Sequence, residues 1–258
     1  MNRRAFLATS AIGTKIALSG CLFGRPSSIE SKEHPEAPDE LDEESAIRFA
    51  KMYEEVTRYN EYIQNDSNII DLDYDCYAAI ERQSGNAFCV VVQCAFSVES
   101  RDESGRSTGE GITNPTLYYL TRGEFIRAET KRIRARTPTE SSNDRYRGIR
   151  LVNFSQKEQT VEIEIAPASS RTDSRKTQFS ETYTVRPHNG FTIERAAISD
   201  GIYFVTVTSD NSLSVTHEWE VPGQDGPDLG RMWSSTEINL GAYILPNGEL
   251  EVRDIPEQ

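Results

Sequence analysis

The chain has 258 residues, 36% of them hydrophobic, which is enough for one large or two modest folded domains and excludes a chain that is disordered throughout. Its 41 acidic residues outnumber the 28 basic ones and give a formal net charge of −13 at pH 7. Because such a surface repels phosphate backbones, the charge argues against nucleic acid as a partner.

Residues 1–21, MNRRAFLATSAIGTKIALSGC, have the features of an export signal. Arg3 and Arg4 supply the positive charge, and residues 5–17 are apolar but too short and too polar to span a bilayer. Residues 2–7, NRRAFL, resemble the twin-arginine export motif, although this motif more usually begins with Ser or Thr. The resemblance implies export across the cytoplasmic membrane.

Residues 18–21, LSGC, resemble a lipobox. This resemblance implies cleavage before Cys21, attachment of lipid to its thiol, and anchoring to the outer face of the cytoplasmic membrane. Arginine supplies 22 of the basic residues and lysine only 6. An acidic, lysine-poor chain behind such a signal resembles haloarchaeal surface proteins, in which salt screens the repulsion between like charges. A mildly acidic lipoprotein from a mesophile is the alternative.

The segment after the anchor, residues 21–42, is rich in Pro, Ser and Glu, which predicts a disordered tether behind the lipidated cysteine. A helix is predicted next, because acidic residues gather at 39–44, where the positive end of a helix favours them. Apolar residues then recur at three- and four-residue steps to about Gln64. The tyrosines of this helix are interpreted as core and rim packing.

Period-two alternation predicts a hairpin that turns at residues 83–86. Residues 70–80 and 88–98 each place apolar side chains on one face. The acidic residues of the first strand point to the other face: Asp71, Asp73, Asp75 and Glu81. The three aspartates are interpreted as a solvated face, because the glycine and glutamate that a calcium loop requires are missing at its sixth and twelfth positions.

The cysteines of this hairpin predict a disulfide. A turn centred on Gly85 pairs residues whose numbers sum to about 170, which places Cys76 opposite Cys94 on the inward face. Residues directly opposite each other lie within disulfide range, and the bond persists outside the cell. Cys89 falls on the other face and is expected to remain a thiol or to pair between chains.

Residues 100–115 are predicted to form a polar loop, and residues 116–129 a second hairpin that turns at Arg122-Gly123. With the helix, these strands predict an α+β domain over residues 43–136, in which a helix packs on an antiparallel sheet. Residues 137–147 are a linker by composition.

Short alternating strands without a helical pattern fill residues 148–258, which predicts an antiparallel β-sandwich and a chain that is mainly β. The stretch SDGIYFVTV at 199–207 resembles the approach to the sixth strand of immunoglobulin-like domains, with Tyr203 in the position of the corner tyrosine. No cysteine follows Cys94, so the inter-sheet disulfide of antibody domains is absent.

No catalytic, cofactor-binding or metal-binding residue is assigned from the sequence, and an enzyme is not expected. A phosphate-binding loop and the zinc-protease helix motif are missing. The predicted sandwich lacks the cysteine that a blue-copper site needs. Of the three histidines, His217 shares an apolar face and is interpreted as a core or rim residue.

Two further features concern the surface. Asn65-Asp-Ser and Asn153-Phe-Ser fit the N-glycosylation pattern, and Asn65 is preferred because it lies at the end of the predicted helix. Residues 122–150 carry nine basic residues against four acidic ones. This segment either docks to an anionic surface or consists of arginines that pair with local acids.

These features predict a lipid-anchored cell-surface protein that acts as a binding or assembly module, with a protein or a surface glycan as its partner. A substrate-capture lipoprotein of a transporter is the second hypothesis, although the alternating strand–helix units of two-lobed binders are lacking. A secreted hydrolase whose catalytic residues the sequence does not reveal is the third, since geometry rather than residue order defines a triad.

Overall fold

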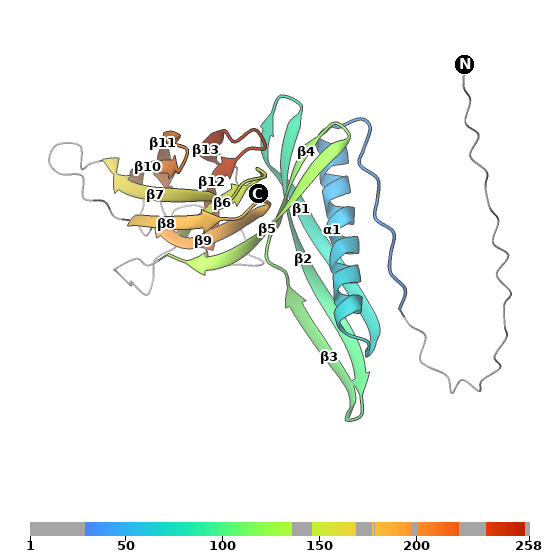
Figure 1. Ribbon diagram of the computed structural model, residues 1–258. Coiled ribbons are helices and arrows are strands. Elements are labelled where there is room, and N and C mark those ends of the chain that lie inside the picture. Colours follow the sequence, from blue (N-terminus) through green and yellow to red (C-terminus); the bar gives the residue numbers. More distant parts are fainter. Residues whose placement is uncertain are drawn as a thin grey trace, which may run out of the picture.

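The computed structural model describes residues 29–135, 146–168, 177, 179–197, 201–221 and 236–255. In this part of the chain one helix, α1 (Glu43–Asn65), accompanies thirteen strands in two sheets (Figure 1). The first strands are β1 (Ile69–Ser84), β2 (Ala87–Asp102), β3 (Gly105–Ile112), β4 (Thr116–Thr121) and β5 (Glu124–Arg134). The later strands are β6 (Tyr146–Asn153), β7 (Gln159–Pro167), β8 (Phe179–Val185), β9 (Asn189–Ala197), β10 (Gly201–Ser209), β11 (Ser214–Val221), β12 (Thr236–Ile244) and β13 (Leu250–Asp254).

The strands form a nine-stranded sheet in the order β1-β2-β4-β5-β9-β6-β12-β13, with β3 paired to the second half of β2, and a four-stranded sheet in the order β11-β10-β7-β8. The prediction of a mainly β protein is confirmed. The larger sheet curls into a half-barrel and continues from the first half of the chain into the second, because β5 pairs with β9. That pairing and the β6–β12 pairing are parallel, so the expectation of purely antiparallel strands is wrong.

Three hydrophobic clusters hold these layers together. One lies between α1 and the outer face of β1, β2 and β4, a second lies in the hollow of the curled sheet, and the third lies between the two sheets. The largest fully buried side chain is Trp219 of β11, which packs on Tyr203 with 6.2 Å between ring centroids. The third cluster packs the four-stranded sheet against part of the nine-stranded sheet, so two sheets are present, and the immunoglobulin-like sandwich over residues 148–258 stays a prediction.

Buried charges join the two edges of the curled sheet. A bulge between Ile80 and Arg82 in β1 turns Arg82 onto the same face as Glu81. Arg82 then donates a hydrogen bond to Glu251 of β13, while Glu81 contacts Arg150 of β6. Glu81 was expected on a solvated face with the three aspartates. Those aspartates are exposed, but Glu81 is buried because this end of the sheet curls over it.

The first hairpin has the predicted register. Cys76 lies opposite Cys94, and the two form a disulfide. Cys89 is fully buried on the other face, and burial raises the pKa of its thiol to about 12. It is free in this chain, and its burial excludes a disulfide to another folded chain.

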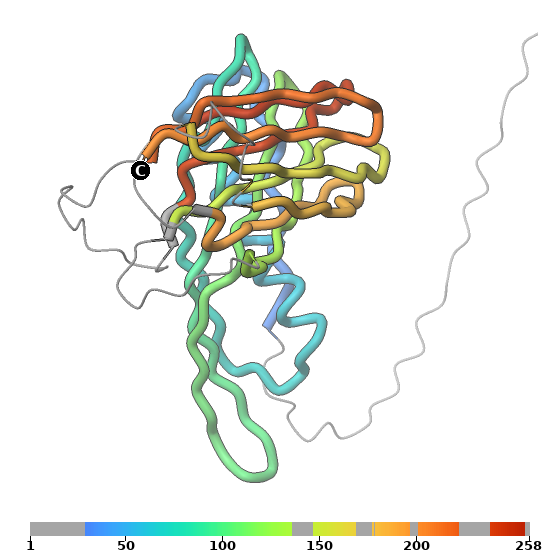
Figure 2. The backbone as a smooth tube through the Cα atoms, turned by 90° about the vertical axis from the view of Figure 1, so that its left-hand side faces the viewer, coloured from blue at the N-terminus to red at the C-terminus, as the bar shows by residue number. Residues whose placement is uncertain are grey.

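The segment that was predicted to be a polar loop, residues 100–115, contains the end of β2 and the whole of β3. These strands form an arm that projects beyond the body of the molecule, as Figure 2 shows. Nearly every side chain of β3 is exposed, so no apolar alternation marks it in the sequence. On the side of α1, Phe96 and Val98 lie against Gly111 and Gly109, where a Cβ atom would be 2.6 and 3.2 Å from them.

Residues 29–42 were predicted to belong to a disordered tether, and this prediction is wrong for these residues. They lie along α1 in extended form (Figure 1). The backbone of Lys32 exchanges two hydrogen bonds of 2.8 Å with the side chain of Asn60, and the Lys32 ammonium lies 3.9 Å from the centre of the Tyr59 ring. Asp42 caps the helix by accepting a hydrogen bond from the Ser45 amide. Such pairing with side chains of a neighbouring helix leaves no periodicity in the sequence.

Candidate binding cleft

A buried carboxylate, Glu54, fixes α1 to the sheet. It accepts hydrogen bonds from Arg58 Nε at 2.7 Å, Thr116 Oγ1 at 2.8 Å, Tyr118 OH at 2.7 Å and Arg127 Nε at 2.8 Å. Burial acts to raise the pKa of Glu54, but the hydrogen bond and charge of Arg127, with the charge of Arg58, hold that pKa below its ordinary value. An ionised side chain therefore holds the helix on the sheet, and both of its carboxylate oxygens accept hydrogen bonds.

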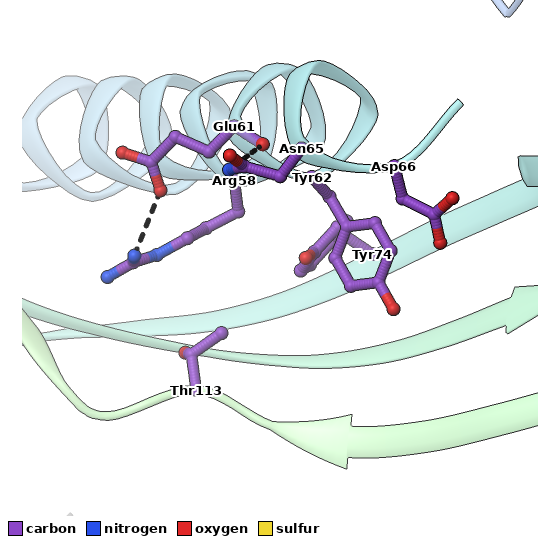
Figure 3. Close-up of a pocket in the computed structure, with 7 residues that line it drawn as sticks. All are labelled: Arg58, Glu61, Tyr62, Asn65, Asp66, Tyr74 and Thr113. Carbon is purple, nitrogen blue, oxygen red and sulfur yellow. Dashed lines mark hydrogen bonds and ion pairs between the residues drawn. The ribbon is translucent and has the colours of Figure 1, made fainter. Parts of the chain in front are cut away.

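An open cleft of about 330 Å³ lies beside this network at the carboxyl end of α1 (Figure 3). Its walls come from the end of the helix and from the strands below it. The lining residues are Arg58, Glu61, Tyr62, Asn65, Asp66, Tyr74 and Thr113. Figure 3 shows side chains of the helix end reaching toward the strands, so the cleft is lined by polar groups and two aromatic rings.

The cleft side chains are held in place by contacts with one another and with residues outside the cleft. The Arg58 guanidinium contacts Glu54, donates to Glu61 at 3.0 Å and lies 3.4 Å from Glu129. The Tyr62 and Tyr74 rings both pack on Phe96, with centroids 5.8 and 5.5 Å away. Because the guanidinium and the rings are already held in place, a ligand would bind here with a smaller entropic cost for ordering side chains.

The chemistry of the cleft suits a neutral polar ligand. Burial raises the pKa of Tyr74 to about 12, so its hydroxyl remains protonated at neutral pH and can donate a hydrogen bond. Glu61 and Asp66 add acceptors, and Asn65 adds an amide. One cation and two anions line the cleft, so it holds no strong charge of one sign.

Two other hollows are less suited to a ligand. One of about 430 Å³ lies between β1 and the arm and is lined by three carboxylates, Asp73, Asp75 and Glu110, and by apolar residues that include Phe96 and Ile112. The other, of about 300 Å³, lies where β11 approaches β13. Of these three, the cleft at α1 is the one that combines two tyrosine rings with a guanidinium, an amide and carboxylates, so we take it as the candidate site.

The residues proposed from the sequence fall in different places. Arg3, Arg4 and Cys21 lie outside the described residues. Asn65 is exposed at the cleft, with its amide donating to the Glu61 carbonyl at 2.7 Å. Asn153 is fully buried.

The burial of Asn153 makes it unsuitable as a glycosylation acceptor in the folded protein. Its amide nitrogen donates to the carbonyl oxygens of Lys157 and Val185, at 2.7 and 3.0 Å. A sugar on this nitrogen would have to displace both bonds and the surrounding core. We therefore propose Asn65 alone as the acceptor.

Four arginines in the described part of the basic segment 122–150 have partners close by. Arg127 contacts Glu54 and Glu129, Arg132 lies 3.9 Å from Glu194, and Arg150 contacts Glu81. The side chain of Arg122 donates to the Asp39 carbonyl. These contacts favour the interpretation in which the arginines pair with local groups.

One motif was overlooked in the sequence: residues 105–109, GRSTG, match the Gly-x-Ser-x-Gly pattern of hydrolase nucleophiles. In hydrolases that serine stands at a sharp turn between a strand and a helix. Here Ser107 lies within β3, and its Oγ is 2.8 Å from Ser100 Oγ. The match therefore gives no support to a hydrolase.

Comparisons with known proteins give no relative from which the role of this cleft could be inferred, so its geometry is the basis for interpreting it. No protein-family model matches the chain, and no curated protein or solved structure matches it significantly. Within the described ranges, no cluster of three or more His, Cys, Asp or Glu side chains could hold a metal ion. Among the described residues, no helix is both long enough and apolar enough to cross a membrane.

Proposed function

We propose that this chain is an exported, lipid-anchored protein of the cell surface that binds a surface glycan in the cleft at the carboxyl end of α1. The proposal of a glycan ligand is based on one observation: two tyrosines, Tyr62 and Tyr74, line an open cleft together with carboxylate, amide and guanidinium groups. Aromatic faces stack on the C–H surface of sugar rings, and the polar groups match their hydroxyls.

The position of residues 29–42 supports the same proposal. Lys32, three positions after the first described residue, contacts Tyr59 and Asn60, which lie in the same last turns of α1 as the helix residues of the cleft. Cys21 lies eight positions before Ile29, and a fully extended chain covers at most about 29 Å over that length. A lipid on Cys21 would thus keep the cleft near the membrane surface, where surface glycans are attached.

The immunoglobulin-like assignment of residues 148–258 belongs to this proposal too. It is supported by two packed sheets and by the buried Tyr203 near the start of β10. In this view the sandwich is a spacer and support for the curled sheet, while the cleft provides the binding function.

The anchor is tested by replacing Cys21 with serine in the full-length chain. We expect the variant to leave the membrane fraction and appear in the medium, because the thiol that carries the lipid is gone. Replacement of both Arg3 and Arg4 with lysine is expected to keep the protein in the cytoplasm. The Cys89→Ala variant, which keeps Cys21, serves as the control and should stay membrane-bound. A Cys21→Ser protein that remains tightly bound to the membrane would contradict the lipobox assignment.

The cleft is tested by titrating the purified full-length chain with a panel of hexoses, N-acetylhexosamines, uronic acids and their disaccharides. We expect one class to bind and Tyr62→Ala to weaken its affinity at least tenfold, since stacking on a ring is lost. Tyr77→Ala is the matched control, because Tyr77 is 56% exposed on the opposite face of β1. Ser67→Ala is used as the parent in all titrations, because it removes the glycosylation pattern and keeps Asn65 in the cleft.

The outcomes of these titrations separate the hypotheses. Equal loss of affinity in Tyr62→Ala and Tyr77→Ala, or no binding of any sugar, would show the glycan proposal to be wrong. Binding of free amino acids or short peptides in the cleft instead would favour the capture of substrates for a transporter.

A further inference from the structure

The outer edge of β3 is an unpaired strand edge. β3 pairs with β2 on one side, and no strand in the described part of the chain pairs with its other side. The arm that carries it stands clear of the sandwich in Figures 1 and 2. Proteins usually protect such edges with proline, lysine or a bulge. The β3 sequence, GRSTGEGI, contains neither proline nor lysine, and its register with β2 is unbroken.

The backbone groups on this edge are those of the even-numbered residues. Thr113 N–H donates to the Cys94 carbonyl at 2.8 Å on the β3 side of β2, and Arg101 N–H donates to the Asn68 carbonyl at 2.9 Å on its other side. Because the direction of N–H and C=O alternates along a strand, the odd-numbered residues of β3 bond to β2. Arg106, Thr108 and Glu110 therefore present their N–H and C=O groups outward.

We propose that two copies of this chain pair through their β3 strands, antiparallel, with Thr108 of each copy opposite Thr108 of the other. In this register Arg106 lies opposite Glu110 of the second copy, and the same pair forms again across the two-fold axis. The three outward-facing residues of each copy would then exchange hydrogen bonds, as in any antiparallel ladder.

The charges of Arg106 and Glu110 favour this register over those in which the two-fold axis passes through a neighbouring residue. A two-fold axis at residue 106 would oppose two arginines, and one at residue 110 would oppose two glutamates, both of which are unfavourable. Axes at 107 or 109 would place the charged residues opposite neutral ones. Only the axis at Thr108 gives two pairs of opposite charge. Arg106 also contacts Glu99 of β2, so it would lie between two carboxylates.

The small residues of β3 make the approach possible. Gly105, Ser107, Gly109 and Gly111 all lie on the face toward α1, so the partner strand meets little side-chain bulk there. The two-fold axis of an antiparallel pair is perpendicular to the sheet, so the α1 helices of both copies would lie on one face of the joined sheet. If Cys21 is lipidated, both anchors lie toward the same side. The pairing itself does not depend on the anchor.

The first test is sedimentation of the full-length chain in mild detergent over a series of protein concentrations. We expect a species of two chains that Thr108→Pro converts to one chain. The Thr108 N–H points outward, so proline there leaves the β2–β3 bonds intact and should preserve the circular dichroism spectrum. Thr108→Val keeps the N–H and is the matched control, which should still pair. A wild-type chain that stays monomeric, or a Thr108→Pro chain that still pairs, would overturn the proposal.

The second test concerns the register. Arg106→Glu or Glu110→Arg alone should weaken pairing at least tenfold, since each places like charges opposite each other twice, and the double exchange should restore it. Spin labels on Thr108→Cys should report a close pair, and labels on Ser104→Cys a separation on the order of 27 Å, from eight residues of strand. The buried Cys89 should not take the label. If the charge variants pair as tightly as the wild type, or if the labels at residues 104 and 108 give other distances, the two copies pair through another surface.

Discussion

Replacement of Glu54 with glutamine is expected to lower the free energy of unfolding by about 3 kcal/mol, because removing one member of a buried charge pair leaves the other without compensation. Arg127 and Arg58 are only 17% and 19% exposed in their side chains, so water replaces the lost carboxylate poorly. Glutamine keeps the shape of the side chain, but its single oxygen can replace only one of the two carboxylate oxygens that accept from Thr116 and Tyr118. The loss is measured by urea unfolding followed by circular dichroism at neutral pH.

Ionisation of Glu54 also makes the free energy of unfolding depend on pH, and its contribution is lost as the pH falls. The pKa of Glu54 is lower in the folded chain than its ordinary value of 4.5. A depressed folded pKa contributes stability that is fully present above the unfolded pKa and is lost as the pH falls through the folded pKa. The difference between wild type and Glu54→Gln should therefore be constant at neutral pH and shrink below about pH 4.5.

The adjacent residue provides the control for this prediction. The Glu55 side chain is 30% exposed and lies 3.8 Å from Lys51, so Glu55→Gln should cost less than about 1 kcal/mol. Equal losses in the two variants would contradict the role given to Glu54. Because Arg58 belongs to both the network and the cleft, Glu54→Gln should also weaken ligand binding, whereas Glu55→Gln should not.

Loss of the Cys76–Cys94 disulfide is the second change with a large expected effect. The bond closes a loop with a sequence separation of 18, for which chain entropy predicts about 3 kcal/mol of stabilisation. The Cys76→Ala/Cys94→Ala double variant should unfold at correspondingly lower urea concentration. Both sulfur atoms belong to buried residues, so dithiothreitol should reduce the bond in the unfolded chain and not in the native one.

Peptide mapping without reduction tests the connectivity directly. A peptide joining Cys76 to Cys94 is expected, with Cys89 recovered as a thiol that reacts only after unfolding. Its raised pKa and complete burial both keep the thiolate from forming in the native state. Cys89→Ala keeps the disulfide and should leave resistance to native-state reduction unchanged. A Cys76 free or joined to Cys89 would contradict the observed register.

Local patterns in the sequence determined the elements whose partners lie close in the chain. The acidic start and the apolar steps placed α1, and alternation around one short turn placed Cys76 opposite Cys94. Such a register needs only the turn and the face of each strand, both of which are local. The resemblances at Arg3, Arg4 and Cys21 are also local, and they stay predictions until the anchor is tested.

Only the tertiary structure decided the features that depend on distant partners. The partners of Glu54 lie up to 73 residues away, and those of Glu81 lie 69 and 162 residues away, so neither carboxylate differs in the sequence from a solvated one. The parallel pairing of β5 with β9 and the curl that buries Glu81 likewise follow from packing of the whole sheet. β3 was missed for the opposite reason, because a strand with both faces in water needs no apolar alternation and is specified by hydrogen bonds to β2 alone.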